Sequence, residues 1–367
     1  MNLENANIVI TTGGTGGHIF PALSLGVHLK NQKASVVIAT DKRGINWLQS
    51  QNNPLETICF TSSSPALSGI FNKIKALILI LQGTLKALLY VKKNKPDLVI
   101  GFGSYASFPI MLAALFLNIP IMMHEQNAVL GKTNRFFAKR AKILALSFEN
   151  TALIPTGVKT VFTGMPVRNA IAKIKSAPLQ FEDNSFKILV TGGSQGASIF
   201  SDIIPQAINA LPDDLRTQIE VVQQCRESEI SKVTEGYQNQ IKNFRIASFF
   251  NDMPNELKSC NLVICRAGSS TIAELATVQR PAILVPLPYA ADNHQAANAR
   301  AFCKNNGGWF FEQKDFSVET LCQKLTELIK NADILVKMAQ NIKNSANIEA
   351  VKNLEKIVND IITKKEF

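Results

Sequence analysis

Gly13-Gly14-Thr15-Gly16-Gly17-His18 and Gly192-Gly193-Ser194-Gln195-Gly196 are two glycine-rich stretches about half a chain apart. Each directly follows a short apolar run typical of a β-strand, residues 8–10 in the first case and 188–190 in the second. Glycine suits a tight turn at a strand end where backbone approaches a ligand, and the amides that open the next helix can bind an anion. The duplication predicts two nucleotide-binding halves that face one cleft.

Composition is that of a globular protein with more than one domain. The chain has 367 residues, 46% hydrophobic and 18% charged, which suits roughly two or three domains, and the repeated loops favour two. The formal net charge of +11 indicates an anionic partner, which could be a nucleic acid, a nucleotide-linked substrate or an acidic membrane surface. Charge alone does not choose among these partners.

Cysteine usage and apolar runs bear on the compartment. The six cysteines form no Cys-x-x-Cys pair, and no basic region leads into a long apolar segment at the start, which favours a reduced, cytosolic protein without a signal peptide. Residues 98–123 carry no charge and are long enough to span a bilayer. Glycine, proline and asparagine interrupt them, which favours instead a strand at 97–101, a helix at 108–117 and a strand at 119–123.

Short β-branched runs alternate with helical patterns in both halves. The predicted strands of the first half are residues 7–11, 34–39, 97–102, 119–123 and 142–146, and those of the second are 186–191, 219–223, 262–265, 281–285 and 308–311. This alternation is typical of doubly wound sheets, so the predicted fold class is α/β with two Rossmann-like domains. Glycine and proline mark a linker within residues 155–186, and helical spacing resumes after about residue 331.

His18 is the first candidate for chemistry, because it follows a glycine loop at an expected helix start. The positive end of the helix dipole there favours a neutral imidazole, which could accept a proton from an attacking hydroxyl. The alternative is a histidine that only caps or packs. The tetrad His124-Glu125-Gln126-Asn127 follows a predicted strand and suggests a site, with a polar loop cap as its alternative.

In the second half, Arg266-Ala267-Gly268-Ser269-Ser270-Thr271-Ile272-Ala273-Glu274 follows a predicted strand. Amides and hydroxyls at this helix start suit phosphate oxygens, and Glu274 is placed to accept hydrogen bonds from ribose hydroxyls; ordinary capping is the alternative. The cluster of residues 292–295 with Asn298 could bind sugar hydroxyls or form a solvated helix face. Neither His-Glu-x-x-His nor Asp-x-Asp occurs, so we expect no metal.

Residues 57–96 contain no acid but interleave lysines with large apolar residues; the lysines are Lys73, Lys75, Lys86, Lys92, Lys93 and Lys95. Such a surface attracts anionic lipid headgroups, so we expect peripheral attachment to an anionic membrane surface. The alternative is that the leucines face the core and the lysines are solvated. Nucleic acid is not expected as a partner, because stacking aromatics are few.

The two glycine loops, residues 124–127, Gly164-Met165-Pro166-Val167-Arg168 and residues 266–274 occur in an order and at a spacing that closely resemble one family. This is the MurG family of bacterial N-acetylglucosaminyltransferases, which convert lipid I to lipid II in peptidoglycan synthesis. The likeness runs from about residue 7 to residue 298. It implies a GT-B glycosyltransferase fold with an acceptor- and membrane-facing domain at residues 1–165, a UDP-sugar-binding domain at 166–340, and a helix within 341–367 that packs back on the first domain. It also implies a peripheral location on the cytoplasmic face of the inner membrane.

Carried over motif by motif, the resemblance implies a donor site for UDP-N-acetylglucosamine. Its residues are Thr15, Gly16, Gly17, Asn127, Arg168, Ser194, Phe250, Ser269, Ser270, Thr271, Ile272, Ala273, Glu274 and Gln295. Phe250 is expected to contact uracil through its backbone. The sequence departs from the family pattern at Gly103-Ser104-Tyr105, where Gly-Gly-Tyr is usual, and at Met165, where asparagine is usual.

The leading hypothesis is an inverting transfer in which the muramoyl C4 hydroxyl of lipid I attacks the anomeric carbon of the donor. His18 is the expected base, and Ser194, residues 269–271 and helix-start amides are expected to stabilise the departing diphosphate without a metal or other cofactor. Proteins of cell-wall synthesis or division are further partners that the resemblance allows.

Three alternatives remain open at this point. One is another UDP-sugar enzyme of the same fold, such as an epimerase or a diacylglycerol glycosyltransferase, and a second is a non-catalytic membrane-bound scaffold. A nicotinamide-dependent oxidoreductase is disfavoured, because residues 13–17 do not follow Gly-x-Gly-x-x-Gly and Asp41 has no matching second half.

Overall fold

A computed structural model describes residues 3–50, 53–62, 70–174, 179, 181, 185–193, 196–345 and 349–363. The chain divides into two compact units. Unit 1 comprises Met1–Arg168 and Asn347–Phe367, and unit 2 comprises Asn169–Ala346. Unit 2 is therefore inserted into the chain of unit 1, and the chain leaves unit 1 at Arg168, near the boundary expected at residues 165 and 166.

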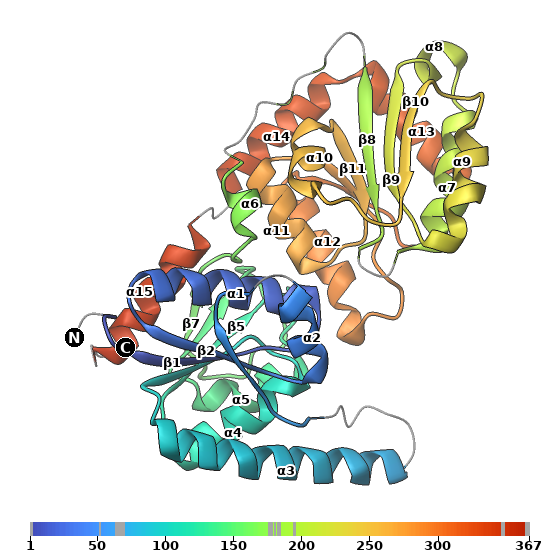
Figure 1. Cartoon of the computed structure of the whole chain (residues 1–367). Helices are drawn as coiled ribbons and strands as arrows, with labels where there is room; N and C mark the ends of the chain where they lie inside the picture. Colours follow the sequence, from blue (N-terminus) through green and yellow to red (C-terminus); the bar gives the residue numbers. More distant parts are fainter. Residues whose placement is uncertain are drawn as a thin grey trace. The chain divides into compact units, whose positions relative to one another are not determined.

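Unit 1 is built on a seven-stranded parallel sheet with the order β3-β2-β1-β4-β5-β6-β7 (Figure 1). Its strands are β1 Asn7–Thr11, β2 Ser35–Thr40, β3 Glu56–Cys59, β4 Leu98–Gly101, β5 Ile121–Glu125, β6 Ile143–Leu146 and β7 Thr160–Phe162. Its helices are α1 Gly16–Asn31, α2 Lys42–Ser50, α3 Ile70–Asn94, α4 Phe108–Phe116, α5 Lys132–Phe137 and α15 Ala350–Ile362, with 3-10 turns η1 Tyr105–Ser107 and η2 Ala138–Arg140.

Successive side chains of a strand point to opposite faces of the sheet, and in unit 1 both faces are covered. Ile8 and Ile10 of β1 pack into a core that α1 and α15 complete, whereas Val9 packs into a second core with α3 and α4. All three side chains are fully buried. This explains why the strand sequences read as continuous apolar runs rather than as alternating ones.

Unit 2 has a six-stranded parallel sheet with the order β10-β9-β8-β11-β12-β13. Its strands are β8 Phe186–Thr191, β9 Ile219–Gln224, β10 Asn243–Ala247, β11 Leu262–Cys265, β12 Ala282–Leu284 and β13 Gly308–Phe310. Its helices are α6 Asn169–Ala172, α7 Ser198–Asn209, α8 Asp213–Arg216, α9 Ile230–Tyr237, α10 Met253–Ser259, α11 Ser269–Val278, α12 His294–Lys304, α13 Val318–Lys330 and α14 Asp333–Ser345, with turns η3 Glu227–Glu229 and η4 Ala291–Asn293.

Counted along the chain, both sheets have the strand order 3-2-1-4-5-6, to which unit 1 adds β7. This is the dinucleotide-binding order, so the predicted pair of Rossmann-like domains is confirmed. Residues 98–123, which could have spanned a membrane by length, fold as β4, α4 and β5. Three strands were not predicted, namely β3, β7 and β10, and all three lie at sheet edges.

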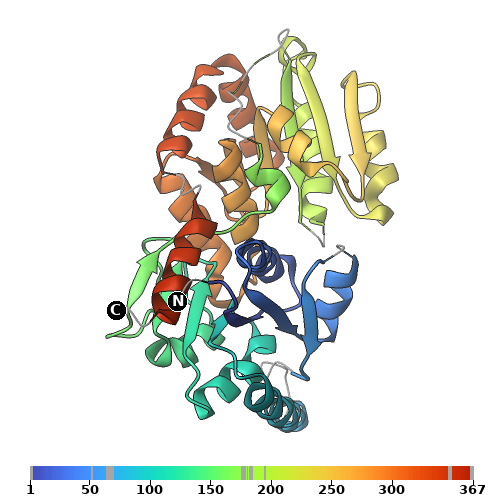
Figure 2. The same cartoon turned by 60° about the vertical axis from the view of Figure 1, so that its left-hand side comes forward.

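The last helix, α15, belongs to unit 1 although unit 2 precedes it in the chain. Leu354 and Val358 are fully buried in the core that α1 shares, and His28 of α1 lies 2.7 Å from Glu355 (Nε2 to Oε2). Figure 2 shows α15, in red, against the blue and green elements of unit 1. Of the segment expected at residues 341–367, α14 ends at Ser345 in unit 2 and only α15 packs on unit 1.

Ser104 adopts a backbone conformation that strongly favours glycine, with φ +67° and ψ 155°. A side chain in this region costs on the order of 1–3 kcal/mol. The serine side chain also fills the space next to Gly13, because a Cβ added to Gly13 would lie 2.2 Å from Ser104 Oγ. Position 104 is one of the two places where the sequence departs from the family pattern, and the departure introduces strain.

We expect Ser104→Gly to raise the free energy of unfolding by about 1 kcal/mol, because relief of strain outweighs the added freedom of the unfolded chain. Urea denaturation followed by circular dichroism measures the change. As a control, Ser35→Gly at the exposed start of β2 should lower stability by about 0.5 kcal/mol. A destabilised Ser104→Gly protein would contradict the assignment of strain.

Candidate functional site

In each sheet the strand order reverses at one point, between β1 and β4 in unit 1 and between β8 and β11 in unit 2. Ligands of open α/β sheets bind beyond the carboxyl ends of the strands at this point. The first glycine loop leaves β1 and the second leaves β8, so each lies at the reversal of its own sheet. Each unit therefore carries one candidate site of its own.

In unit 1 the glycine loop ends in the amino terminus of α1. Thr15 is the N-cap in an extended conformation, and among the described residues its side chain makes no capping hydrogen bond. The first turn is Gly16, Gly17, His18 and Ile19, none of which is acidic. The positive end of this helix dipole is therefore suited to an anionic group.

His18 is half-buried in the first turn of α1 and points toward the end of β5. Its Nδ1 lies 2.8 Å from Oε1 of Gln126. An added Cβ on Gly103 would lie 3.5 Å from Cε1 of His18, so the ring also lies close to the loop that follows β4. The expected helix-start position of His18 is confirmed, and the ring has a polar partner beyond capping and packing.

The tetrad of residues 124–127 is arranged differently from the expectation. His124 and Glu125 do not follow β5 but are its last two residues, paired with Ala145 and Leu146 of β6. Both are buried, as is Gln126. The expectation that four polar side chains emerge together at the strand end is therefore wrong for these two residues, because the buried strand continues through them.

The Glu125 carboxylate organises the loop after β5. Oε1 accepts hydrogen bonds from the backbone N and Nδ2 of Asn127 at 3.0 and 3.2 Å, and Oε2 accepts from Gly131 N and Asn134 Nδ2 at 2.9 and 2.8 Å. Asn134 was not singled out in the sequence, since it lies nine residues further on in α5 and only folding brings it to the carboxylate. These contacts position Asn127, one of the expected donor contacts.

His124 is held neutral by its surroundings. Burial lowers its pKa from the usual 6.5 to about 4; the hydrogen bond with Gly164 O, 3.1 Å from Nε2, opposes this shift, and nearby His18 adds to it. The unfolded chain therefore binds a proton at His124 at a higher pH than the folded chain does. Folding stability attributable to this residue is present above pH 6.5 and is lost as the pH falls toward 4.

We expect the free energy of unfolding of the wild type to fall between pH 6.5 and 4 more steeply than that of His124→Gln, by about 3 kcal/mol over the range. Urea titrations at several pH values measure both slopes. The comparison concerns slopes, so a uniform loss of stability in the variant does not disturb it. Parallel profiles for the two proteins would contradict the buried, neutral state of His124.

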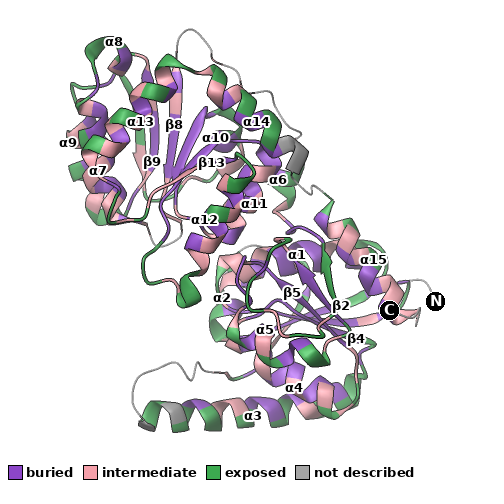
Figure 3. Ribbon diagram, turned by 180° about the vertical axis from the view of Figure 1, so that it is seen from behind, coloured by how far each residue is buried: buried purple, intermediate pink, exposed green. Residues whose placement is uncertain are grey.

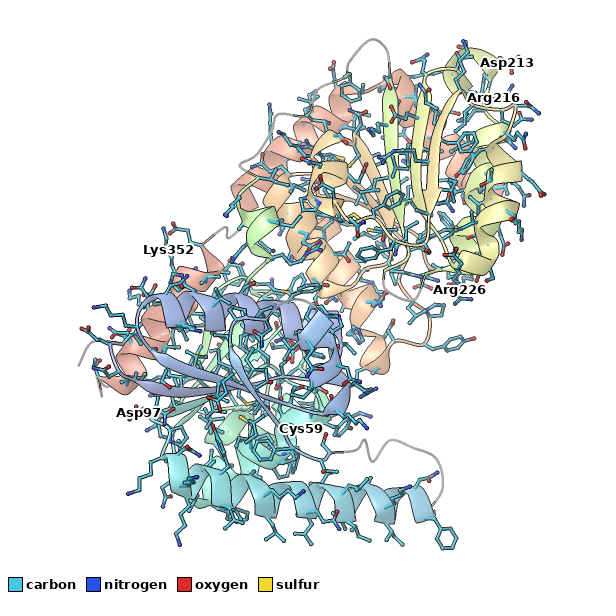
Figure 4. The ribbon with its side chains drawn as sticks, in the orientation of Figure 1. Cys59, Asp97, Asp213, Arg216, Arg226 and Lys352 are labelled. Carbon is cyan, nitrogen blue, oxygen red and sulfur yellow. The ribbon has the colours of Figure 1, made fainter. Side chains whose placement is uncertain are left out.

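In unit 2 the second glycine loop requires glycine for steric reasons. Gly193 and Gly196 have φ of +75° and +67°, and a Cβ on Gly192 would lie 2.4 Å from Ala197 N. Arg226, labelled in Figure 4, lies next to Gly196, where an added Cβ would meet its Cγ at 2.8 Å, and it donates from Nη1 to Ser198 Oγ at 3.0 Å. Ser194, an expected donor contact, lies outside the described residues.

Helix α11 begins at Ser269, with Gly268 as its N-cap, so the predicted helix start is confirmed. The preceding loop is held from two sides. Arg266 donates to Val285 O, Pro286 O and Gln313 Oε1 at 3.0, 3.2 and 2.7 Å, and buried Asn298 donates to Ala267 O at 3.2 Å. Asn298 therefore positions this loop from within the protein, rather than presenting its amide on a solvated face.

The remaining expected donor contacts have their own environments. Half-buried Phe250 lies under the Arg245 guanidinium, which is 5.6 Å from the ring centroid. Gln295 Oε1 accepts a hydrogen bond from Leu287 N at 2.9 Å.

Arg168, the last residue of the first segment of unit 1, lies over the Phe20 ring, 5.1 Å from its centroid. Ile272 is buried, so only its backbone is suited to a ligand contact.

The expected site residues are thus divided between the units. Thr15, Gly16, Gly17, His18, Asn127 and Arg168 belong to unit 1, and Phe250, residues 269–274 and Gln295 belong to unit 2. Within the described ranges, no group of three or more His, Cys, Asp or Glu side chains is placed to hold a metal ion.

Helix α3 carries exposed residues, green in Figure 3, along its length, and many of them are large and apolar. We call this set the α3 apolar face: Phe71, Ile74, Leu77, Ile78, Leu81, Leu85 and Leu89, which are 50–84% exposed. The opposite side of the helix packs on unit 1 through small or branched residues such as Ala76, Ala87 and Val91. The alternative that the leucines face the core is therefore wrong for these positions.

Charge and length distinguish α3 further. Lys75, Lys86, Lys92, Lys93 and Lys95 are exposed on the helix or directly after it. Within the described residues, Ile74–Asn94 is the one stretch that is long and apolar enough to cross a membrane by length and composition, and 28% of its most apolar window is buried.

Family models match both units. Residues 8–145 match the glycosyltransferase family 28 N-terminal domain, and residues 187–356 match the family 28 C-terminal domain. A Rhodospirillum rubrum protein named UDP-N-acetylglucosamine–N-acetylmuramyl-(pentapeptide) pyrophosphoryl-undecaprenol N-acetylglucosamine transferase is 39% identical over 356 residues, 96% of this chain and 91% of that protein. A protein of the same name from Rickettsia bellii is 39% identical over 97% of this chain and 99% of its own length.

Solved structures agree with this relationship. MurG from Acinetobacter baumannii superposes with a TM-score of 0.78 at 29% identity, covering 98% of this chain and 99% of its own. A putative UDP-N-acetylglucosamine 2-epimerase from Listeria monocytogenes has a TM-score of 0.69 but 14% identity over 98% of this chain and 97% of its own, a likeness of fold alone.

Proposed function

The chain belongs to glycosyltransferase family 28, and from this premise we propose how it catalyses the reaction for which its relatives are named. It is an N-acetylglucosaminyltransferase that moves N-acetylglucosamine from UDP-N-acetylglucosamine to lipid I. The observation that carries this function is the identity of about 39% with proteins of that name along nearly the whole chain. The residue roles below are our proposal.

Our proposed chemical step is a single displacement at the anomeric carbon of the donor. The oxygen of the muramoyl C4 hydroxyl forms the new bond to this carbon, the bond to the UDP oxygen breaks, and UDP leaves with the bonding electrons. The hydroxyl proton passes to Nε2 of His18. The hydrogen bond between His18 Nδ1 and Gln126 supports this role, because it leaves Nε2 as the nitrogen that can accept a proton.

Unit 2 is the proposed donor-binding unit. Helices α7 and α11 both begin at the carboxyl edge of the sheet. The first turn of α7, Ser198–Ser201, contains two serines, that of α11, residues 269–272, contains two serines and a threonine, and neither turn contains an acid. Helix-start amides and hydroxyls stabilise an anion without a metal, so these turns would hold the diphosphate and stabilise the charge that develops on it. Glu274, one turn further along α11, would accept hydrogen bonds from the ribose.

We expect His18→Ala to lower kcat by about 10²- to 10⁴-fold while the affinity for UDP, measured by calorimetry, changes little. Radiolabelled N-acetylglucosamine incorporated into lipid I measures turnover. His28→Gln, on the same helix, is the matched control and should retain activity. Full turnover by folded His18→Ala would remove the base assignment, whereas absence of UDP binding in the wild type would contradict the donor site.

The α3 apolar face and its lysines would hold unit 1 on the cytoplasmic leaflet of the inner membrane. Lipid I is anchored in that membrane by its undecaprenyl chain, so an enzyme that works on it gains from residing there. Seven large apolar side chains exposed on one helix exceed what a solvated surface usually carries, and each nearby lysine adds on the order of 1 kcal/mol on an anionic surface. Attachment would be peripheral, since the other side of α3 packs on unit 1.

We expect Leu77→Gln with Leu81→Gln to abolish most binding to phosphatidylglycerol vesicles, measured by co-sedimentation. Lys75→Gln with Lys86→Gln should weaken it by about 2 kcal/mol, roughly 30-fold, and reduce its dependence on salt. Turnover of a water-soluble lipid I analogue should stay unchanged in both proteins, because their substitutions lie outside the proposed site. Equal binding of all three proteins would contradict attachment through α3.

A further inference from the structure

Three side chains in unit 1 form a hydrogen-bonded row that ends at the proposed base. His18 Nδ1 lies 2.8 Å from Gln126 Oε1, Gln126 Nε2 lies 3.0 Å from His124 Nδ1, and His124 Nε2 lies 3.1 Å from Gly164 O. We propose that Gln126 is a positioning residue that fixes the tautomer of His18, so that Nε2 is always the proton acceptor. This inference rests on the proposed role of His18 as the base.

The orientation of the Gln126 amide is determined by a backbone group. Gln126 Nε2 also lies 2.9 Å from the carbonyl oxygen of His124, and a carbonyl oxygen can only accept a hydrogen bond. The NH₂ group of Gln126 must therefore face residue 124, and its oxygen must face His18. Because an amide oxygen only accepts, His18 Nδ1 must carry the proton, and neutral His18 has its lone pair on Nε2.

The hydrogen bonds of His124, at the far end of the row, agree with this orientation of the Gln126 amide. Gln126 Nε2 donates to His124 Nδ1, so the proton of neutral His124 is on Nε2 and is donated to Gly164 O. His124 is fully buried and neutral, so protonation of its Nδ1 does not disturb the row in the physiological range. Each group in the row then donates a hydrogen bond to the next, from His18 through Gln126 and His124 to Gly164 O.

Gln126 differs from the carboxylate that orients histidine in hydrolase triads, because an amide fixes the tautomer without a negative charge. After the transfer His18 carries protons on both nitrogens, and the bond from Nδ1 to the amide oxygen is retained and becomes charge-assisted. The proton on Nε2 can then be released to water. The row selects which nitrogen reacts and does not itself accept the proton.

Selective ¹⁵N-histidine labelling tests the tautomer directly, without activity. The chain has four histidines, so His18→Gln identifies the His18 signals in two-bond ¹H–¹⁵N correlation spectra. In the neutral wild type we expect a protonated Nδ1 and an unprotonated Nε2 at His18. In Gln126→Met, which keeps the length of the side chain but lacks the amide, we expect a mixture of both tautomers. A protonated Nε2 in the neutral wild type would overturn the proposal.

Kinetics test whether the tautomer matters for the reaction. We expect Gln126→Met to lower kcat several-fold with KM for both substrates nearly unchanged, because only the fraction of the enzyme with the correct His18 tautomer reacts. Gln32→Leu, at the exposed end of α1, is the matched control and should leave kcat unchanged. Unchanged kcat in Gln126→Met with mixed tautomers would refute the positioning role while leaving the base assignment intact. Full turnover of His18→Ala would refute the base assignment while the tautomer result stands.

Discussion

Apolar packing on both faces of each parallel sheet is the constraint on which the rest of the structure depends. Along β1, Ile8 and Ile10 enter one core and Val9 enters another, and all three side chains are fully buried. Buried polar side chains of such a sheet lie near the ends of the strands, where loops supply hydrogen-bonding partners. The candidate sites of both units lie at the carboxyl edge of the sheets, where the glycine loops and helix starts follow β1 and β8.

Two polar residues within β5 show what this constraint demands. His124 and Glu125 are buried strand residues, and a buried carboxylate is stable only if its oxygens accept hydrogen bonds. The loop after β5 meets this demand by turning back, so that Asn127, Gly131 and Asn134 all donate to Glu125. The same turn brings Gln126 against His18. The proposed arrangement of His18 and Gln126 therefore follows from the hydrogen bonds that the buried polar atoms after β5 require.

Local signals in the sequence were sufficient for the architecture of the two units. Glycine loops after apolar runs predicted both strand–loop–helix starts, since these depend on a few adjacent residues. The edge strands β3, β7 and β10 were missed because they are partly or fully exposed and carry no continuous apolar run. The end of β5 was placed too early, because the partners that let Glu125 remain in a strand come from the loop after β5 and from α5. The exposed face of α3 could have been predicted from the sequence. The small residues Ala76, Gly83 and Ala87 recur at helical spacing and mark the opposite, packed side of the helix.

The return of α15 to unit 1 has a consequence for synthesis on the ribosome. Leu354, Val358 and Ile361 fill one core of unit 1, yet they follow the whole of unit 2 in the chain. Until they emerge, the apolar surface of β1 and α1 beneath them stays uncovered, whereas unit 2 is already complete in sequence. Domains usually mature in order from the amino terminus. In this chain the order is reversed, because unit 1 begins before unit 2 yet cannot close its hydrophobic interior until α15 has been translated after unit 2.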